Sequence, residues 1–175
     1  EGKYQKGHQL YGEDELWICG PHGENKRRLT SRTHVSEFTW SPTGAFICFE
    51  GLDSTGQSDE PYYLGAIDIA TQQKSIIDIG SPYNDISFSI SPNGKMVAYC
   101  KPLEWELRTE WWVSNADIFI ANIDGSGKTR ITDTEAVETM VKWSADGKSL
   151  LVEQHGIEPG DSLLPRYIKV VLKKQ

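Results

Sequence analysis

A turn motif that occurs three times in this chain constrains its fold more than any other feature. Residues 40–44 read WSPTG, residues 90–94 read ISPNG and residues 143–147 read WSADG, and an apolar segment follows each copy. The copies begin 50 and then 53 residues apart, at 40, 90 and 143. Repeats of this length that are made of strands are typical of β-propeller blades. The spacing therefore predicts an all-β fold built from four-stranded antiparallel blades.

The chemistry of the motif agrees with this prediction. Ser-Pro-x-Gly forms a tight turn, because proline presets φ at the first central position and glycine accepts a positive φ at the end. Apolar segments lie on both sides, so the turn is expected to join two antiparallel strands. The large residue just before the turn is Trp40, Ile90 or Trp143, and we expect these three to be structural anchors that pack between adjacent sheets.

The rest of each unit is also regular, and Pro, Gly and Asp interrupt every stretch long enough for a helix. If the strands of one blade are named A (inner), B, C and D (outer), the chain reads C-D, A-B-C-D, A-B-C-D, A-B-C. We expect a single propeller segment over residues 1–175. It comprises a half-blade at 14–30, blades at 35–80 and 84–132, and a partial blade at 137–174.

Residues 14–154 resemble the repeat of TolB-type propellers. The resemblance lies in LWICGPHGENKRRLT with FTWSPTGAFICF, and in DIFIANIDGSGKTRITDTEAVETMVKWSADGKSLLV. Thr43 and Asn93 replace the usual Asp of the turn, Ile90 replaces Trp, and Ala145 replaces Pro. The resemblance implies the fold and a place in the periplasm or at the cell surface. It does not imply one function, because periplasmic scaffolds, peptidase propeller domains and sugar-acid lyases share this repeat.

The family usually closes six or seven blades, and this chain has material for about three. Open blade edges would expose unpaired backbone groups and apolar faces. One interpretation is that the chain is part of a larger propeller. The other is a homo-oligomer, in which the A and B strands of one copy's last blade meet the C and D strands of another copy's first. In that arrangement the strand at 166–174 would compete with 16–19 for one slot.

The connections between strands B and C are long, at 51–61, 101–115 and 155–165, and all three project from the same face. Long connections without repeat character are where a scaffold carries specific binding. The middle one contains residue types that are enriched at binding hot spots, and we expect a protein partner to bind there. The candidate residues are Trp105, Arg108, Trp111 and Trp112. The alternatives are that these tryptophans cover the end of a blade, or that Trp111 or Trp112 stacks on a sugar ring.

A second candidate site is the channel that the inner strands would surround. We expect His34, Glu37, Asp85 and Glu138 to lie near it. Carboxylates around a channel could hold a cation or the basic end of a peptide, and a solvated wall is the alternative. One histidine is not a metal site, so no metal and no cofactor are expected. The acidic segment 53–60 lacks the spacing of a calcium loop.

No catalytic motif is found in the sequence. Its four histidines are widely spaced and no GxSxG occurs. Residues 125–128 read GSGK but lack the spacing of a phosphate loop, so a hairpin is expected there. The net charge of −7 disfavours nucleic acid and anionic membranes. No apolar run approaches the roughly 20 residues of a membrane span. Cys19, Cys48 and Cys100 lie in apolar segments and are interpreted as small buried residues.

These observations favour a non-catalytic protein-interaction or assembly module that binds through the face with the long B–C connections. One alternative is the propeller domain of a serine peptidase whose hydrolase domain lies outside this chain. Another is the subunit of a filament that assembles through open blade edges. The chain begins at Glu1 without Met or a signal peptide, so we expect a processed protein or a part of a longer one. Three cysteines argue slightly against an oxidising compartment, and the resemblance argues for one.

Overall fold

The computed structural model describes residues 15–53, 62–80, 87–107, 111–156 and 165–172, and side chains are described except those of 53, 105–107 and 111–114. These residues form strands and turns, and none of them belongs to a helix that could cross a membrane. The strands are β1 (Trp17–Ile18), β2 (Arg27–Arg28), β3 (Thr33–Trp40), β4 (Phe46–Asp53), β5 (Tyr63–Asp68), β6 (Lys74–Ile79), β7 (Phe88–Ile90), β8 (Met96–Leu107), β9 (Trp111–Asn122), β10 (Thr129–Arg130), β11 (Val137–Trp143), β12 (Ser149–His155) and β13 (Arg166–Val171).

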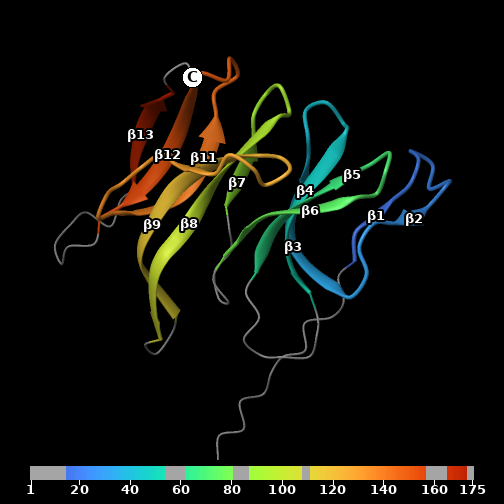
Figure 1. Cartoon of the computed structure of the whole chain (residues 1–175), viewed down its shortest axis with the longest axis horizontal. Helices are drawn as coiled ribbons and strands as arrows, with labels where there is room; N and C mark the ends of the chain where they lie inside the picture. The colour runs from blue at the N-terminus through green and yellow to red at the C-terminus, as the bar shows by residue number, and fades with distance from the viewer. Residues whose placement is uncertain (1–14, 54–61, 81–86, 108–110, 157–164, 173–175) are drawn as a thin grey trace, which may run out of the picture.

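The strands form a row of propeller blades, which Figure 1 shows side by side. We name them blade I (β1-β2), blade II (β3-β4-β5-β6), blade III (β7-β8-β9-β10) and blade IV (β11-β12-β13). Neighbouring strands within a blade are antiparallel, and blades III and IV also share one parallel pairing, Val137 with Ala116. The prediction of an all-β, partial propeller with four-stranded antiparallel blades is confirmed.

The three copies of the turn motif close the A–B hairpins in the same way. In each copy the backbone N–H of the serine donates to the carbonyl across the turn, at 2.8 to 2.9 Å, and the glycine has a positive φ of 67° to 70°. The serine hydroxyl accepts a second bond from the backbone at the start of strand B. Ala145 in place of proline therefore leaves the turn intact. All three turns lie on the same side of the row of blades, the upper side in Figure 1.

Apolar side chains fill the space between neighbouring blades. Adjacent residues of a strand point to opposite sheet faces, so one strand contributes side chains to two apolar cores, one on each side of its sheet. In β4, Ile47 packs toward blade I and Cys48 toward blade III. In β8, Val97 packs toward blade II and Ala98 toward blade IV. The B strands of blades II and III thus pack against a neighbouring blade on each side and are apolar at consecutive positions.

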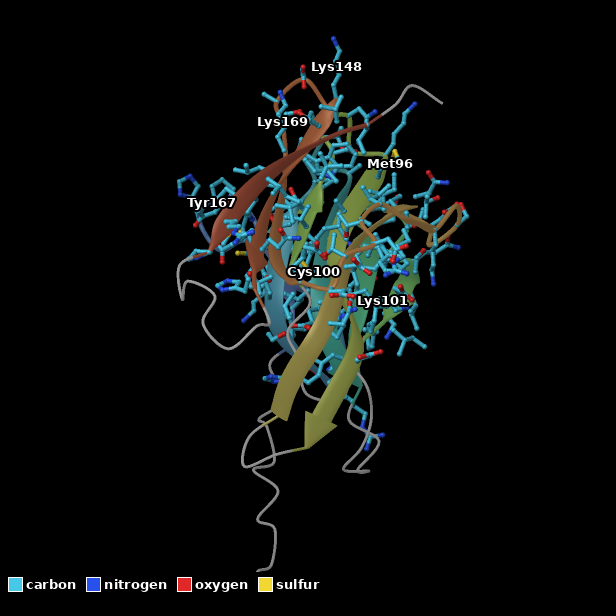
Figure 2. All side chains as sticks on the ribbon, turned by 90° about the vertical axis from the view of Figure 1, so that its left-hand side faces the viewer. Met96, Cys100, Lys101, Lys148, Tyr167 and Lys169 are labelled. Carbon is cyan, nitrogen blue, oxygen red and sulfur yellow. The ribbon has the colours of Figure 1, made fainter. Side chains whose placement is uncertain are left out.

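The middle B–C connection differs from expectation, because most of 101–115 is strand. β8 and β9 are twelve residues long and pair as far as Leu107 with Trp111. Register shifts occur on either side of Glu104, next to Pro102, which has no N–H for the ladder. The two strands extend beyond the rest of the row in both views (Figures 1 and 2). The expected loop is therefore mainly a projecting two-stranded ribbon.

β13 occupies the outer edge of β12 in this structure. β13 pairs with β12 over six positions, from Ser149 with Val171 to Gln154 with Arg166. β13 is therefore the C strand of blade IV. The proposed pairing of two copies needs β1 of the second copy at this same edge, so it would require β13 to leave.

The three anchors do not have the same environment. Ile90 is buried, and Trp143 is half-buried with its indole Nε1 donating to the Ser89 carbonyl at 3.0 Å. Trp40, in contrast, is 46% exposed. The role of Trp40 as an anchor between two sheets stays a prediction, because the described residues of blade I include no inner strand beside it.

Candidate binding surfaces

The ribbon of β8 and β9 brings the predicted tryptophans together. Trp105 lies across from Val113, Trp112 from Glu106, and Trp111 from Leu107. Their side chains, and the whole of Arg108, lie outside the described part of the chain. The backbone pairing places all three tryptophans within the last three cross-strand pairs of one projecting element.

A buried carboxylate fixes the base of this ribbon to the neighbouring blade. Asp78 of β6 accepts hydrogen bonds from the Tyr99 hydroxyl at 2.8 Å, from Lys101 Nζ at 2.9 Å and from Lys128 Nζ at 3.1 Å. Burial acts to raise the pKa of Asp78, but the bonds from Lys101, Tyr99 and Lys128 outweigh it and lower the pKa below its usual value. The outer strand of blade II is thereby tied to the strand from which the ribbon extends.

Glu138 is the one candidate channel residue that forms a buried polar cluster among the described residues. It is 1% exposed, and its carboxylate accepts bonds from Thr134 Oγ1 at 2.9 Å and Gln154 Nε2 at 3.1 Å. Thr132 Oγ1 lies 3.3 Å from it and 3.1 Å from a carboxylate oxygen of Asp117. Burial, aided by the negative charge of Asp117, raises the pKa of Glu138 to about 7.

Asp117 is fully buried and has a cationic partner. Arg130 donates to it through Nε at 2.7 Å and again through its terminal nitrogen, and also pairs with Asp133 at 2.8 Å. Because Arg130 balances the charge of Asp117, the added charge of an ionised Glu138 would be uncompensated. Burial and the nearby charge of Asp117 therefore favour the protonated form of Glu138.

The remaining channel candidates do not join Glu138 in a site. His34 is half-buried in β3 with its ring edge-on to Tyr62 at 6.4 Å, and Glu37 is exposed next to a bulge in β3. Asp85 lies outside the described residues. Within the described ranges, no group of three His, Cys, Asp or Glu side chains could hold a metal ion.

Sequence reasoning missed the polar cluster around Asp117, although the repeat contains a signal for it. In blade I the Thr30 hydroxyl accepts from the Leu16 amide at 2.8 Å, and Arg28 lies 3.3 Å from Glu15. In blade III, Thr132, Ile118, Arg130 and Asp117 repeat the arrangement, with the hydroxyl again 2.8 Å from the amide. An Arg-(Leu/Ile)-Thr segment whose arginine lies 13 residues after an acidic residue therefore marks a D strand bonded to its C strand.

The three cysteines differ in their exposure to solvent. Cys48 and Cys100 are buried as expected, and burial raises the pKa of Cys48 to about 12 and that of Cys100 also. Cys19 is exposed, contrary to expectation, because the turn that follows β1 leaves it at the surface. The two buried thiols are protonated at neutral pH and act as apolar side chains.

Comparisons with known proteins agree on the fold. No family model matches the sequence. A segment of 62 residues is 37% identical to dipeptidyl-peptidase 5 from Porphyromonas gingivalis. The putative TolB from Agrobacterium tumefaciens superposes with a TM-score of 0.66 over 94% of this chain, at 17% identity. The tricorn protease superposes with a TM-score of 0.61 over 88% of the chain, also at 17% identity.

The chain is much shorter than these proteins. The matched parts make up 9% of the dipeptidyl-peptidase, 55% of the TolB chain and 14% of the tricorn protease. At these identities the structural matches establish the fold alone. The chain has a TolB-like β-propeller fold, and it spans a part of each larger protein.

Proposed function

We propose that this chain is a non-catalytic propeller module that binds a protein partner through the face on which its B and C strands connect. The observation that supports this is the ribbon of β8 and β9, which extends beyond the blades and contains three tryptophans in its last three cross-strand pairs. Aromatic residues contribute much of the binding energy of protein interfaces. The anchoring of Lys101 to Asp78 holds the base of the ribbon in place.

The test is a double variant, Trp111→Ser with Trp112→Ser. We expect it to keep the thermal stability of the parent chain and to lose most of the partner that the immobilised parent retains from an extract of its source organism. The matched control is Val171→Ser, which removes an exposed apolar side chain from blade IV and should leave capture unchanged. A collapse of thermal stability in the double variant would mean that these tryptophans cover the end of a blade. Undiminished capture would place the interface elsewhere.

The second candidate function is that of a propeller domain in a serine peptidase. The 37% identity to dipeptidyl-peptidase 5 favours it, as does the superposition on the tricorn protease. In that case the B–C face would lie toward a hydrolase domain encoded outside residues 1–175. Reading the open reading frame around this segment tests the proposal: an α/β domain with a GxSxG motif supports it, and a frame without one excludes it.

We also propose a location in the periplasm or at the cell surface, which the resemblance to TolB-type repeats supports. The buried positions of Cys48 and Cys100 are compatible with an oxidising compartment, because neither thiol is accessible to a partner thiol. Fractionation of the source cells tests this location, and recovery of the chain in the cytosol would contradict it.

A further inference from the structure

A hydroxyl at the junction of blades III and IV lies between two buried carboxyl groups. Thr132 Oγ1 accepts the backbone N–H of Ile118 at 2.8 Å. It lies 3.1 Å from Oδ1 of Asp117 and 3.3 Å from Oε2 of Glu138. A hydroxyl has a single hydrogen to donate, so both contacts are hydrogen bonds only when one of the two carboxyl groups carries a proton. Arg130 pairs with Asp117, which leaves Glu138 as the group that takes the proton.

The same groups hold the connection between β10 and β11 against β9. Thr134 donates from its hydroxyl to Glu138 at 2.9 Å and from its amide to Asp117 at 3.3 Å. The Thr134 carbonyl accepts from Nδ2 of Asn115 at 3.4 Å. Asn115 lies at the base of the ribbon, next to the parallel pairing that blades III and IV share. The bonds around Glu138 therefore fix the junction at the point where the ribbon leaves blade III.

Within the described ranges, no cation bonds to Glu138. The titratable and charged groups on the elements around it are Cys100 of β8, Asp117 of β9, Arg130 of β10, Asp133 in the connection, and Glu153 and His155 of β12. Arg130 pairs with both aspartates, and His155 pairs with Glu153 at 3.1 Å. An ionised Glu138 would thus be a buried charge without a partner of opposite sign.

Another junction of the same repeat is closed without a carboxyl group at this position. Val35 lies five residues before its anchor tryptophan and next to a bulge, as Glu138 does. Beside it, the Leu16 amide donates to the Thr30 hydroxyl at 2.8 Å, the bond that Ile118 makes in blade III. Val35 packs against the apolar cluster that contains Leu16. The repeat therefore needs no ionisable side chain here, and Glu138 adds one to a framework that closes without it.

We infer that the junction of blades III and IV is pH-sensitive: it is closed while Glu138 is protonated, and its end at the base of the ribbon opens when Glu138 ionises. The opening is local, because the apolar cluster of Ala98, Val141 and Leu150 also joins the two blades. The pKa of Glu138 is about 7 in the folded chain against an ordinary 4.5. The closed form is therefore fully favoured below about pH 4.5 and loses this advantage as pH rises to 7. The inference goes beyond the proposed function and does not depend on a partner of the ribbon.

Hydrogen exchange of single amides in the full chain tests this inference. The Ile118 amide reports on the junction that contains Glu138, and the Leu16 amide reports on the junction that contains Val35. After correction for the intrinsic exchange rate, we expect the protection of Ile118 to fall by more than about tenfold between pH 5.5 and pH 8. The protection of Leu16 should change by less than about twofold.

Variants at Glu138 assign the effect to this carboxyl group. Glu138→Gln stays neutral and should keep the protection of Ile118 the same at the two pH values. Glu138→Val, which copies the apolar residue of blade II, is the second variant if the glutamine variant does not fold. Glu135→Gln removes an exposed carboxylate nearby and should behave like the parent chain.

Three results would overturn the inference. The first is protection of Ile118 in the parent chain that does not change between pH 5.5 and pH 8. The second is an equal loss of protection in Glu138→Gln, because a different group, such as His155, would then be responsible. The third is exchange of Ile118 at pH 8 that accelerates in low urea as steeply as that of Val152, which pairs on both sides in blade IV. Such exchange would mean that the whole chain opens and not the junction alone.

Discussion

At the scale of single residues, the repeat allows side chains to be compared at equivalent positions of one molecule. The same tryptophan before the same turn is half-buried and hydrogen-bonded in β11 and exposed in β3. The sequence alone predicts the same environment for both tryptophans, because the local pattern around them is the same. The difference arises from the neighbouring blade, which is present beside Trp143 and lacks described inner strands beside Trp40.

The two tryptophans should therefore differ in their contribution to stability. We expect Trp143→Ala to lower the free energy of unfolding by roughly 3 kcal/mol, because it removes a packed ring and leaves the Ser89 carbonyl without its donor. Trp40→Ala should cost less than about 1 kcal/mol, as at other exposed positions. Urea denaturation of both variants measures this. Equal losses would mean that the Trp40 face is covered in solution.

Glu138 should make stability depend on pH. Burial raises the pKa of this carboxyl from 4.5 to about 7, so the folded state binds the proton more tightly than the unfolded state does. The stabilisation is fully present below about pH 4.5 and is lost as pH rises toward 7. We expect Glu138→Gln, which stays neutral, to be more stable than the parent at pH 8 and to flatten this part of the profile.

Urea denaturation at pH 5 and pH 8 measures the effect of Glu138→Gln. The matched control is Glu135→Gln, a change at an exposed glutamate three residues away that should keep the parent's profile. If both variants show the same pH dependence as the parent, another group accounts for it. The pKa of Asp78 is lowered, so its contribution is lost only as pH falls further into the acid range.

At the scale of elements, neighbouring blades contact each other through a turn as well as through their sheet faces. The β9–β10 turn shows this contact. Gly125 has a φ of 85°, and a Cβ on it would lie 2.6 Å from the Ile76 carbonyl oxygen of β6. Gly44, in the A–B turn of blade II, has a φ of 70° and nothing within 4 Å of such a Cβ.

Alanine substitutions at these two glycines distinguish the cost of backbone strain from the cost of a collision between blades. Gly44→Ala should cost about 1 kcal/mol, the penalty of a left-handed conformation for a residue with a Cβ. Gly125→Ala should cost roughly 3 kcal/mol, since it adds a collision with the backbone of blade II. Denaturation of the two variants measures the difference. If the costs are equal, the β9–β10 turn does not rest on β6 in solution.

At the scale of the whole molecule, we expect β13 to limit how the chain can associate. While β13 covers the edge of β12, β1 of a second copy cannot pair there. A chain that ends at Pro165 leaves this edge free. Two such copies can then form a closed six-bladed ring, in which each last blade takes its C and D strands from the partner.

We therefore expect the chain truncated after Pro165 to sediment as a discrete dimer, and the full chain to sediment at its own mass of 19.7 kDa. Sedimentation equilibrium over a range of concentrations measures this. A full-length chain that dimerises as readily as the truncated one would mean that β13 is displaced in solution. A ladder of sizes that grows with concentration would support the filament instead.

The sequence by itself determined the blades, their strand order and their turns. The Ser-Pro-x-Gly turns and the alternation of apolar residues act through neighbours in the chain, and such local preferences can be read from residue order. It predicted that Glu138 lies near the channel, but not the contacts with Thr132, Thr134 and Gln154 that surround it. Only the tertiary structure decided that Trp40 is exposed, that 101–115 forms a ribbon and that β13 covers β12. Each of these depends on which sheet lies beside a residue, and packing between distant segments sets that.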